Sequence, residues 1–249
     1  METTVRLAQN VLSVRRDQRR LLGLLAVLCA AAWLGSLRIA SQMGAGTPHQ
    51  HHGGLWPLAV MWGAMMVAMM VPPEMPRLLW LAKAHRQQRR DPMLHALAFL
   101  GGYLSPWMVA SLGAALLQAQ LGAAGLMTEE MATGSRALGG ALLAVAGAMQ
   151  LSPVKRACLA RCRSRAAVAA SPGETSSESF LRGTGHGAMS IGSCGLLMLV
   201  LFVTGVMSAL AMALLTTLLL LENVAPERWP VRWVAGVLLL GWGASLFLL

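Results

Sequence analysis

Long apolar runs, separated by short polar segments rich in glycine and proline, divide this chain of 249 residues. A helix needs roughly 20 apolar residues to cross about 30 Å of hydrocarbon, and several runs approach or reach this length. The runs are continuous and do not alternate, which favours helices over the strands of a membrane β-barrel. The pattern therefore predicts an all-α fold, a polytopic membrane protein built as a bundle of about six transmembrane helices. The predicted spans are residues 21–40, 55–71, 94–118, 134–151, 191–221 and 231–249.

Prolines and polar segments set the expected boundaries of these spans. The second span is expected to end at Pro72 and Pro73, because proline lacks the donor that continues a helix and restricts the residue before it. The fifth run, 191–221, is longer than one simple crossing and must tilt, break or project. Residues 164–185, around the stretch AASPGETSSES, predict a flexible cytoplasmic loop. The expected organisation is a basic cytoplasmic N-terminus, residues 1–20, followed by a single six-helix membrane domain, residues 21–249.

Composition and charge place the protein in a membrane. Only 12% of the residues are charged, whereas about 25% are charged in an average soluble domain. The net charge of +10 would by itself suggest nucleic acid, but 16 of the 20 Lys and Arg residues fall in the N-terminus and in the loops 74–93 and 152–190. Cytoplasmic loops carry such an excess. We therefore expect a multi-pass protein of the bacterial cytoplasmic (inner) membrane, with both termini cytoplasmic, that contacts the lipid bilayer and no nucleic acid.

The stretch MWGAMMVAMMVPPEM, residues 61–75, begins in the second span and holds six of the 17 methionines. On a helix, Met61, Met65 and Met69 would share one face. Met66 and Met70 would lie beside that face. Methionine fills irregular gaps in apolar packing, and its thioether is also a soft ligand that suits Cu(I). Packing and metal binding are both open interpretations of this block.

The fifth span repeats the combination of soft sulfur ligands. Cys194 and Met198 stand four residues apart and would share a helix face. His186 precedes them near the cytoplasmic end, and Met207 lies further outward. A lone cysteine in an apolar helix can also be a small buried hydrophobic residue, so this set too has a packing interpretation.

The motif CLARC places Cys158 and Cys162 four residues apart. On a helix both thiols would face the same way, and the surrounding Lys and Arg side chains would favour the thiolate. Two thiolates can supply two ligands of a copper or zinc site, although four-coordinate zinc needs two more. The alternative is a basic interfacial helix with incidental cysteines.

A short loop before the second span, HQHHGG, offers His49, His51 and His52. Neutral imidazoles in such a loop can capture Cu(II), Zn(II) or Ni(II) outside the membrane. The same loop could equally be solvated and inert.

Four motifs occur in order along the chain: MMVAMMVPP (65–73), GYLSPW (102–107), QLSPVKRACLARCR (150–163) and HGAMSIGSCGLLMLVLFVTGVMSALAM (186–212). In this combination, over about residues 55–225, the chain resembles a bacterial family described as predicted metal-binding integral membrane proteins. The resemblance implies that the protein binds a metal. The sequence departs from the family pattern at the start of the fifth span. Relatives carry several cysteines there, and this chain has Ser190, Ser193 and a lone Cys194.

The leading hypothesis is an integral membrane protein that binds or passes copper(I) through Met and Cys ligands on the second and fifth helices. Zinc is the other candidate ion, and the expected partner is a copper enzyme, a metallochaperone or a membrane complex. Two alternatives stay open: a non-catalytic accessory or scaffold subunit of a larger membrane complex, and a membrane thiol redox protein using Cys158 and Cys162. No nucleotide-binding loop, Ser/His/Asp arrangement or zinc-protease helix motif occurs in the sequence, so no catalytic residue is predicted.

Overall fold

The prediction of an all-α protein is confirmed by the computed structural model, which describes residues 2–44, 54–128, 131–164, 173–206, 208–224 and 230–248. These residues contain no strand, only one isolated β-bridge between Met127 and Thr133. The helices are α1 (Glu2–Gly44), α2 (Leu55–Gln87), α3 (Pro92–Ala123), α4 (Arg136–Leu151), α5 (Pro153–Arg163), α6 (Ser176–Cys194), the 3₁₀ helix η3 (Gly195–Val200), α7 (Leu201–Thr204), α8 (Ala209–Val224) and α9 (Val231–Leu248).

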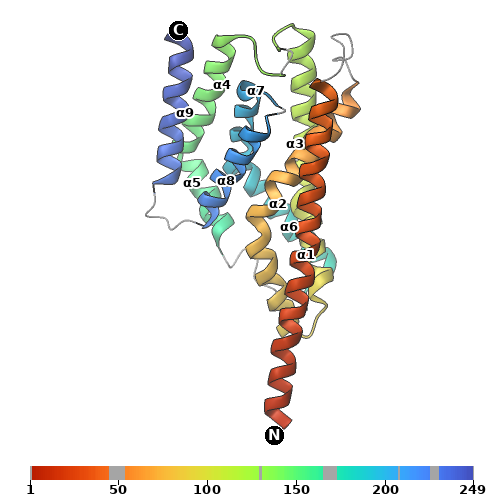
Figure 1. Ribbon diagram of the computed structural model, residues 1–249. Helices are drawn as coiled ribbons and strands as arrows, with labels where there is room; N and C mark the ends of the chain where they lie inside the picture. Colours follow the sequence, from red (N-terminus) through yellow and green to blue (C-terminus); the bar gives the residue numbers. More distant parts are fainter. Residues whose placement is uncertain are drawn as a thin grey trace.

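Five of the described helical segments are long and apolar enough to cross a membrane. They lie in α1, α2, α3, the continuous run from α6 through α7, and α9. The pair α4 and α5 meets the same test as a sixth span bent by 60°. By length and composition the molecule is therefore compatible with a polytopic helical bundle (Figure 1).

The direction of the helices departs from the expected topology in the middle of the predicted fifth span, 191–221. Gly205 has φ of 93°, a backbone conformation that glycine adopts readily. The chain turns there, so that α7 and α8 run in opposite directions (Figure 1). Residues 191–221 are thus two antiparallel segments. As a result α9 ends at the opposite end of the bundle from the start of α1, and the structure does not place both termini on one side.

The predicted end of the second span at Pro72 and Pro73 is wrong. Helix α2 continues through both prolines and through Pro76 to Gln87. Proline frees a carbonyl one turn earlier, and in a helical bundle a neighbouring helix can supply the missing donor. The methionine block therefore lies in the middle of a long helix and not at its end.

Helix α6 begins inside the segment expected to be a flexible loop. Thr175 accepts a hydrogen bond from the backbone of Glu178 and the Glu178 side chain accepts one from the backbone of Thr175, which is a capping box. This arrangement satisfies two donors at the helix start. Residues 176–185 are accordingly helical, and residues 165–172 of the predicted loop lie outside the described part of the chain.

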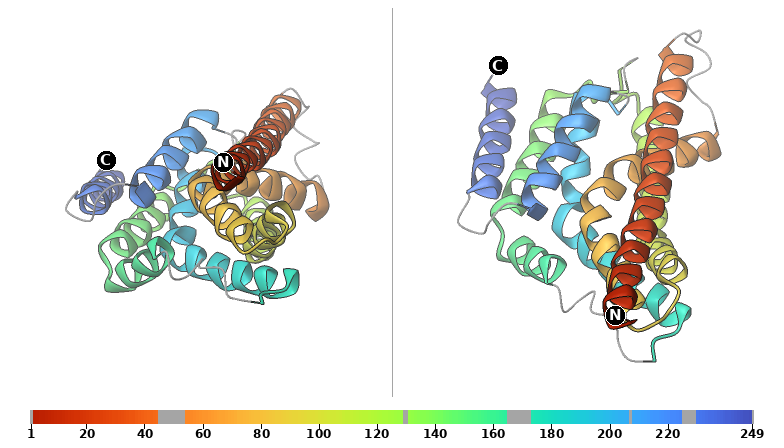
Figure 2. Two further views of the ribbon diagram at one scale, coloured as in Figure 1. Left: turned by 90° about the horizontal axis from the view of Figure 1, so that it is seen from below. Right: turned by 60° about the horizontal axis from the view of Figure 1, so that its bottom comes forward.

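Helices α3 and α6 pack against each other along glycines. A Cβ atom on Gly183 would lie 2.1 Å from the carbonyl oxygen of Phe99, and one on Gly187 would lie 2.3 Å from that of Tyr103. Only glycine permits this approach of two backbones, as at other close helix contacts in membranes. The contact holds α6 beside α3 (Figure 2).

Candidate functional site

Three sulfur-containing side chains from three helices line one small buried cavity. Met70 lies in α2 and Cys162 in α5, and Cys194 is the last residue of α6. The cavity has a volume of about 10 Å³, close to the space that a single water molecule needs. We call it the sulfur cavity. Its other lining residues are Pro73, Glu74, Tyr103, Leu159, Ser190, Ser193, Leu219, Glu222 and Asn223.

Local structure explains why Cys194 faces this cavity. Helix α6 ends at Cys194, and the chain continues as the 3₁₀ helix η3. A 3₁₀ stretch within a longer helical run often marks a functional position. The Cys194 thiol donates a hydrogen bond to the carbonyl oxygen of Ser190 at 3.0 Å, which fixes its direction.

A tyrosine links two sides of the cavity. The hydroxyl of Tyr103 lies 3.8 Å from the sulfur of Met70 and 3.2 Å from the hydroxyl of Ser190. Tyr103 is fully buried, so its hydroxyl needs a partner inside the protein. The phenol therefore positions the Met70 thioether beside the α6 segment that carries Cys194.

The first of two buried carboxylates at the cavity, Glu74, is held by charged neighbours. Arg77 donates to one carboxylate oxygen, as the spacing of the two residues along α2 indicates. The Nε2 atom of His186 lies 3.1 Å from the other oxygen. Arg77 also donates to Asn223 of α8 at 3.0 Å. His186 thus contacts Glu74, which lines the sulfur cavity, but His186 itself does not line it.

The second carboxylate, Glu222 of α8, lies opposite and is also paired. The Lys155 ammonium group is 2.7 Å from one oxygen, and the Gln150 side chain donates to the other at 2.9 Å. Arg163 donates to the backbone carbonyl of Glu222. A buried charge is costly unless it is paired. Both carboxylates of the cavity therefore have a compensating cation.

The other predicted sulfur ligands occupy different surroundings. Met65, Met69 and Met198 are buried in the apolar core and do not line the sulfur cavity. Cys158 is half-buried, and its sulfur would lie 3.0 Å from a Cβ atom on Gly192. Cys158 therefore faces α6 outside the cavity. The remaining candidates, Met207, His49, His51 and His52, lie outside the described residues.

Several residues of the cavity were missed by sequence reasoning. Tyr103 is the chain's only tyrosine and lies in the motif GYLSPW. These two features were the signal in the sequence that could have identified it. Ser190 and Ser193 were noted only as departures from a cysteine pattern, yet both line the cavity beside Cys194. Glu222 is separated from Glu74 by more than a hundred residues, and no local spacing connects them.

The donor set has a clear chemical preference. One thioether and two thiols are soft ligands, which suit Cu(I) and not hard cations. All four cysteines are free, so both thiols of the cavity are available for such a bond. The chemistry of the cavity therefore fits monovalent copper carried as cargo.

Comparison with known proteins agrees with this chemistry. No curated protein and no solved structure matches the chain. A family described as "PpoB2: Copper chaperone" matches residues 59–246, which include all the residues that line the sulfur cavity. The match extends over most of the chain, and the protein therefore belongs to the PpoB2 copper chaperone family.

Proposed function

We propose that the protein is a membrane-embedded copper chaperone that holds one Cu(I) ion in the sulfur cavity, through Met70, Cys162 and Cys194. The observation that carries this proposal is that three sulfur-containing residues, from α2, α5 and α6, line one buried cavity of about 10 Å³. Residues so far apart in sequence are brought together only by the fold. The family membership supports copper as the ion.

The size and charge of the cavity favour Cu(I) over a hydrated divalent ion. Space for about one water molecule leaves no room for a hydration shell, whereas Cu(I) binds few, soft ligands without one. Binding requires both thiols to lose a proton, which leaves a Cu(I) site with two thiolates and one net negative charge. Arg77 and Lys155 are already paired with the carboxylates of Glu74 and Glu222. The cation that would offset the extra charge is Arg163, which donates to the backbone carbonyl of Glu222.

The wider route is part of the same proposal. The protein would lie in the bacterial cytoplasmic membrane, where the loop histidines His49, His51 and His52 would collect the ion. The methionines of α2 and of the α6–α8 region would line the path to and from the cavity, namely Met65, Met69, Met198 and Met207. Cys158, His186 and a partner copper enzyme or metallochaperone would take part in transfer.

The test is a competition for Cu(I) against a chromophoric chelator, under reducing conditions, with the full chain in detergent. The wild type is expected to hold one tightly bound ion per chain. Cys162→Ser and Cys194→Ser should each weaken binding by at least about 100-fold, because even partners outside the first coordination shell are worth about 10–100-fold. Cys158→Ser is the matched control. It removes a thiol from the same helix, α5, but Cys158 does not line the cavity.

Equal affinity in all three variants would contradict the sulfur cavity as the copper site. A wild type that retains no copper would favour the alternative of an accessory or scaffold subunit. Cys29→Ser supplies a second control, because Cys29 lies in α1, away from the cavity.

A further inference from the structure

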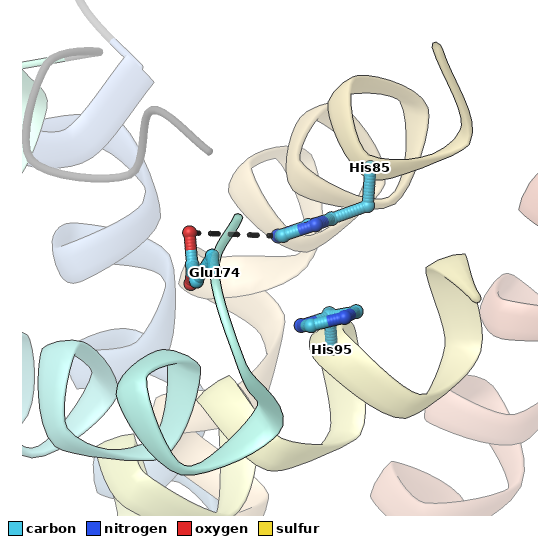
Figure 3. A group of neighbouring side chains, drawn as sticks. All are labelled: His85, His95 and Glu174. Carbon is cyan, nitrogen blue, oxygen red and sulfur yellow. Dashed lines mark ion pairs between the residues drawn. The ribbon is translucent and has the colours of Figure 1, made fainter. Parts of the chain in front are cut away.

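A second cluster of metal-ligating side chains lies at the end of the bundle where α1 begins (Figure 1). His85 comes from the last turn of α2, His95 from the first turn of α3, and Glu174 from the segment just before α6. All three are buried, and each offers one ligand atom within 4.8 Å of the other two. The two imidazole rings stack, and the Glu174 carboxylate lies at their edge (Figure 3).

His85 is the unexplained member of this cluster. Its side chain is fully buried, and neither ring nitrogen has a hydrogen-bond partner among the described residues. Its ring lies 4.0 Å from that of His95 at an angle of 5°, so the neighbouring ring offers its face and not a donor or acceptor. A buried polar group without a partner destabilises the fold, and such a group calls for a specific occupant such as a water molecule or an ion.

The other two members are already oriented. One oxygen of Glu174 accepts a hydrogen bond from Ser179 at 2.5 Å and lies 3.2 Å from Arg182. The other oxygen points to His85, with 3.9 Å between it and Nε2. Ser179 also lies 2.9 Å from Nδ1 of His95. Ser179 therefore contacts both Glu174 and His95. In metal sites, such hydrogen bonds hold the ligating side chains in position.

We infer that His85, His95 and Glu174 form a binding site for a divalent transition-metal ion of the zinc type. Two imidazoles and one carboxylate are ligands that zinc uses at bonds of about 2.0–2.2 Å. Tetrahedral bonds of that length separate ligand atoms by about 3.4 Å, so rotation of the two rings and of the carboxylate brings the three atoms, now within 4.8 Å, onto one ion. Two arginines hold Glu174 in place: Arg182 lies beside its carboxylate, and Arg90 donates to its backbone carbonyl. Their positive charges also lower the affinity of the site for a metal cation.

The site is chemically distinct from the sulfur cavity, because it contains no sulfur. Its three ligands come from the last turn of α2, the first turn of α3 and the segment just before α6. The bound ion would therefore tie the α2–α3 turn to α6, and it would stabilise this end of the bundle whether or not copper is bound.

The experiment uses the full chain with a histidine-free affinity tag and with His49, His51 and His52 replaced by Asn, so that the loop cannot contribute ligands. Copper is excluded, and Zn(II) and the spectroscopic probe Co(II) are titrated separately. One ion per chain is expected, with a rise in the unfolding temperature on addition of Zn(II). X-ray absorption at the zinc edge should show nitrogen and oxygen ligands, and sulfur ligands would overturn the proposal.

Variants then assign the ligands. His85→Asn, His95→Asn and Glu174→Gln should each reduce Co(II) affinity at least tenfold, while Cys194→Ser should leave it unchanged. Retained binding of Cu(I) shows that a variant is folded. Absence of Zn(II) binding in the parent protein, or binding that survives in all three variants, would overturn the site. The X-ray measurement on the parent protein keeps the test decisive even if a variant does not fold.

Discussion

The indole Nε1 of Trp33 donates a hydrogen bond to the carbonyl oxygen of Ala68, at 3.2 Å. Ala68 lies one helical turn before Pro72, which has no N–H to satisfy that carbonyl. Helix α1 therefore supplies the donor that α2 lacks. This contact explains how α2 passes through Pro72, the first of its three prolines, and continues to Glu74 at the sulfur cavity.

Replacing Trp33 with Phe should destabilise the protein by about 1–3 kcal/mol, because the Ala68 carbonyl is left without its donor in an apolar environment. Pro72→Ala restores a backbone N–H within α2. In that background Trp33→Phe should cost less, and the double-mutant cycle should give a clear coupling energy. Denaturant unfolding in detergent micelles measures both values, and equal costs in the two backgrounds would show that the indole only packs.

The α3–α6 contact is tested by adding one methyl group. Gly183→Ala places a Cβ atom 2.1 Å from the Phe99 carbonyl oxygen, and neither backbone can move aside without separating the helices. We expect a loss of more than about 3 kcal/mol, above the usual cost of overpacking. Gly185→Ala, two residues away, meets no atom within 4 Å and should be neutral or stabilise the helix by about 0.5–1 kcal/mol. Thermal unfolding compares the two, and similar melting temperatures would contradict the packing.

The buried pair of Lys155 and Glu222 should be costly to break. Lys155→Met removes the ammonium group 2.7 Å from the carboxylate and should cost about 3–5 kcal/mol, because an uncompensated charge stays buried. Adding Glu222→Gln should recover part of this loss. Arg86→Ala breaks the partly exposed pair with Asp17 and should cost less than about 1 kcal/mol, because solvent screens the Arg86 charge. A Lys155→Met variant as mild as Arg86→Ala in the same unfolding assay would contradict a stabilising buried pair between Lys155 and Glu222.

A third thiol in the sulfur cavity should tighten copper binding. Ser193 lines the cavity next to Cys194, and Ser193→Cys adds a soft ligand. We expect the Cu(I) affinity to rise at least tenfold. Ser36→Cys is the matched control, because Ser36 is also buried and donates to a helix carbonyl, but it lies in α1 outside the cavity. Equal effects of the two substitutions in chelator competition would mean that position 193 does not face the ion.

The sequence indicates the class of fold well, because apolar runs of this length have few alternatives to helices. It fails where tertiary contacts override a local rule. Pro72 would normally end a helix, and the donor that Trp33 supplies to the Ala68 carbonyl shows how α2 continues past it. The positive φ of Gly205 splits a run that is uniformly apolar, and hydrophobicity cannot signal that change of direction.

The sequence predicts the chemical class of the metal ligands, but it identifies only some of the residues that form the site. The sequence identifies Met70, Cys162 and Cys194 as soft ligands, but with equal weight it identifies Met65 and Met69. All of these methionines are buried, so burial does not separate them. What distinguishes Met70 is its position opposite Tyr103 and the α6–η3 junction, which depends on packing between distant helices.

The cluster of His85, His95 and Glu174 could not be predicted from the sequence either. His85 and His95 flank the turn between two helices, and nothing in their spacing predicts that their rings stack. Glu174 lies within the segment that the sequence predicts to be a flexible loop, so composition gives no reason to pair it with either histidine. The three-dimensional approach of these side chains is visible only in the folded chain.

The most direct test of the copper proposal is X-ray absorption at the copper edge on the wild-type protein loaded with one Cu(I) per chain. The proposal predicts three sulfur neighbours at bonds of about 2.3 Å, the usual metal–sulfur length. Met70→Leu should reduce the number to two, and Met66→Leu, a buried methionine one turn earlier that does not line the cavity, should leave it at three. A copper ion bound by nitrogen or oxygen atoms, or a sulfur count that Met70→Leu leaves unchanged, would contradict the sulfur cavity as the site.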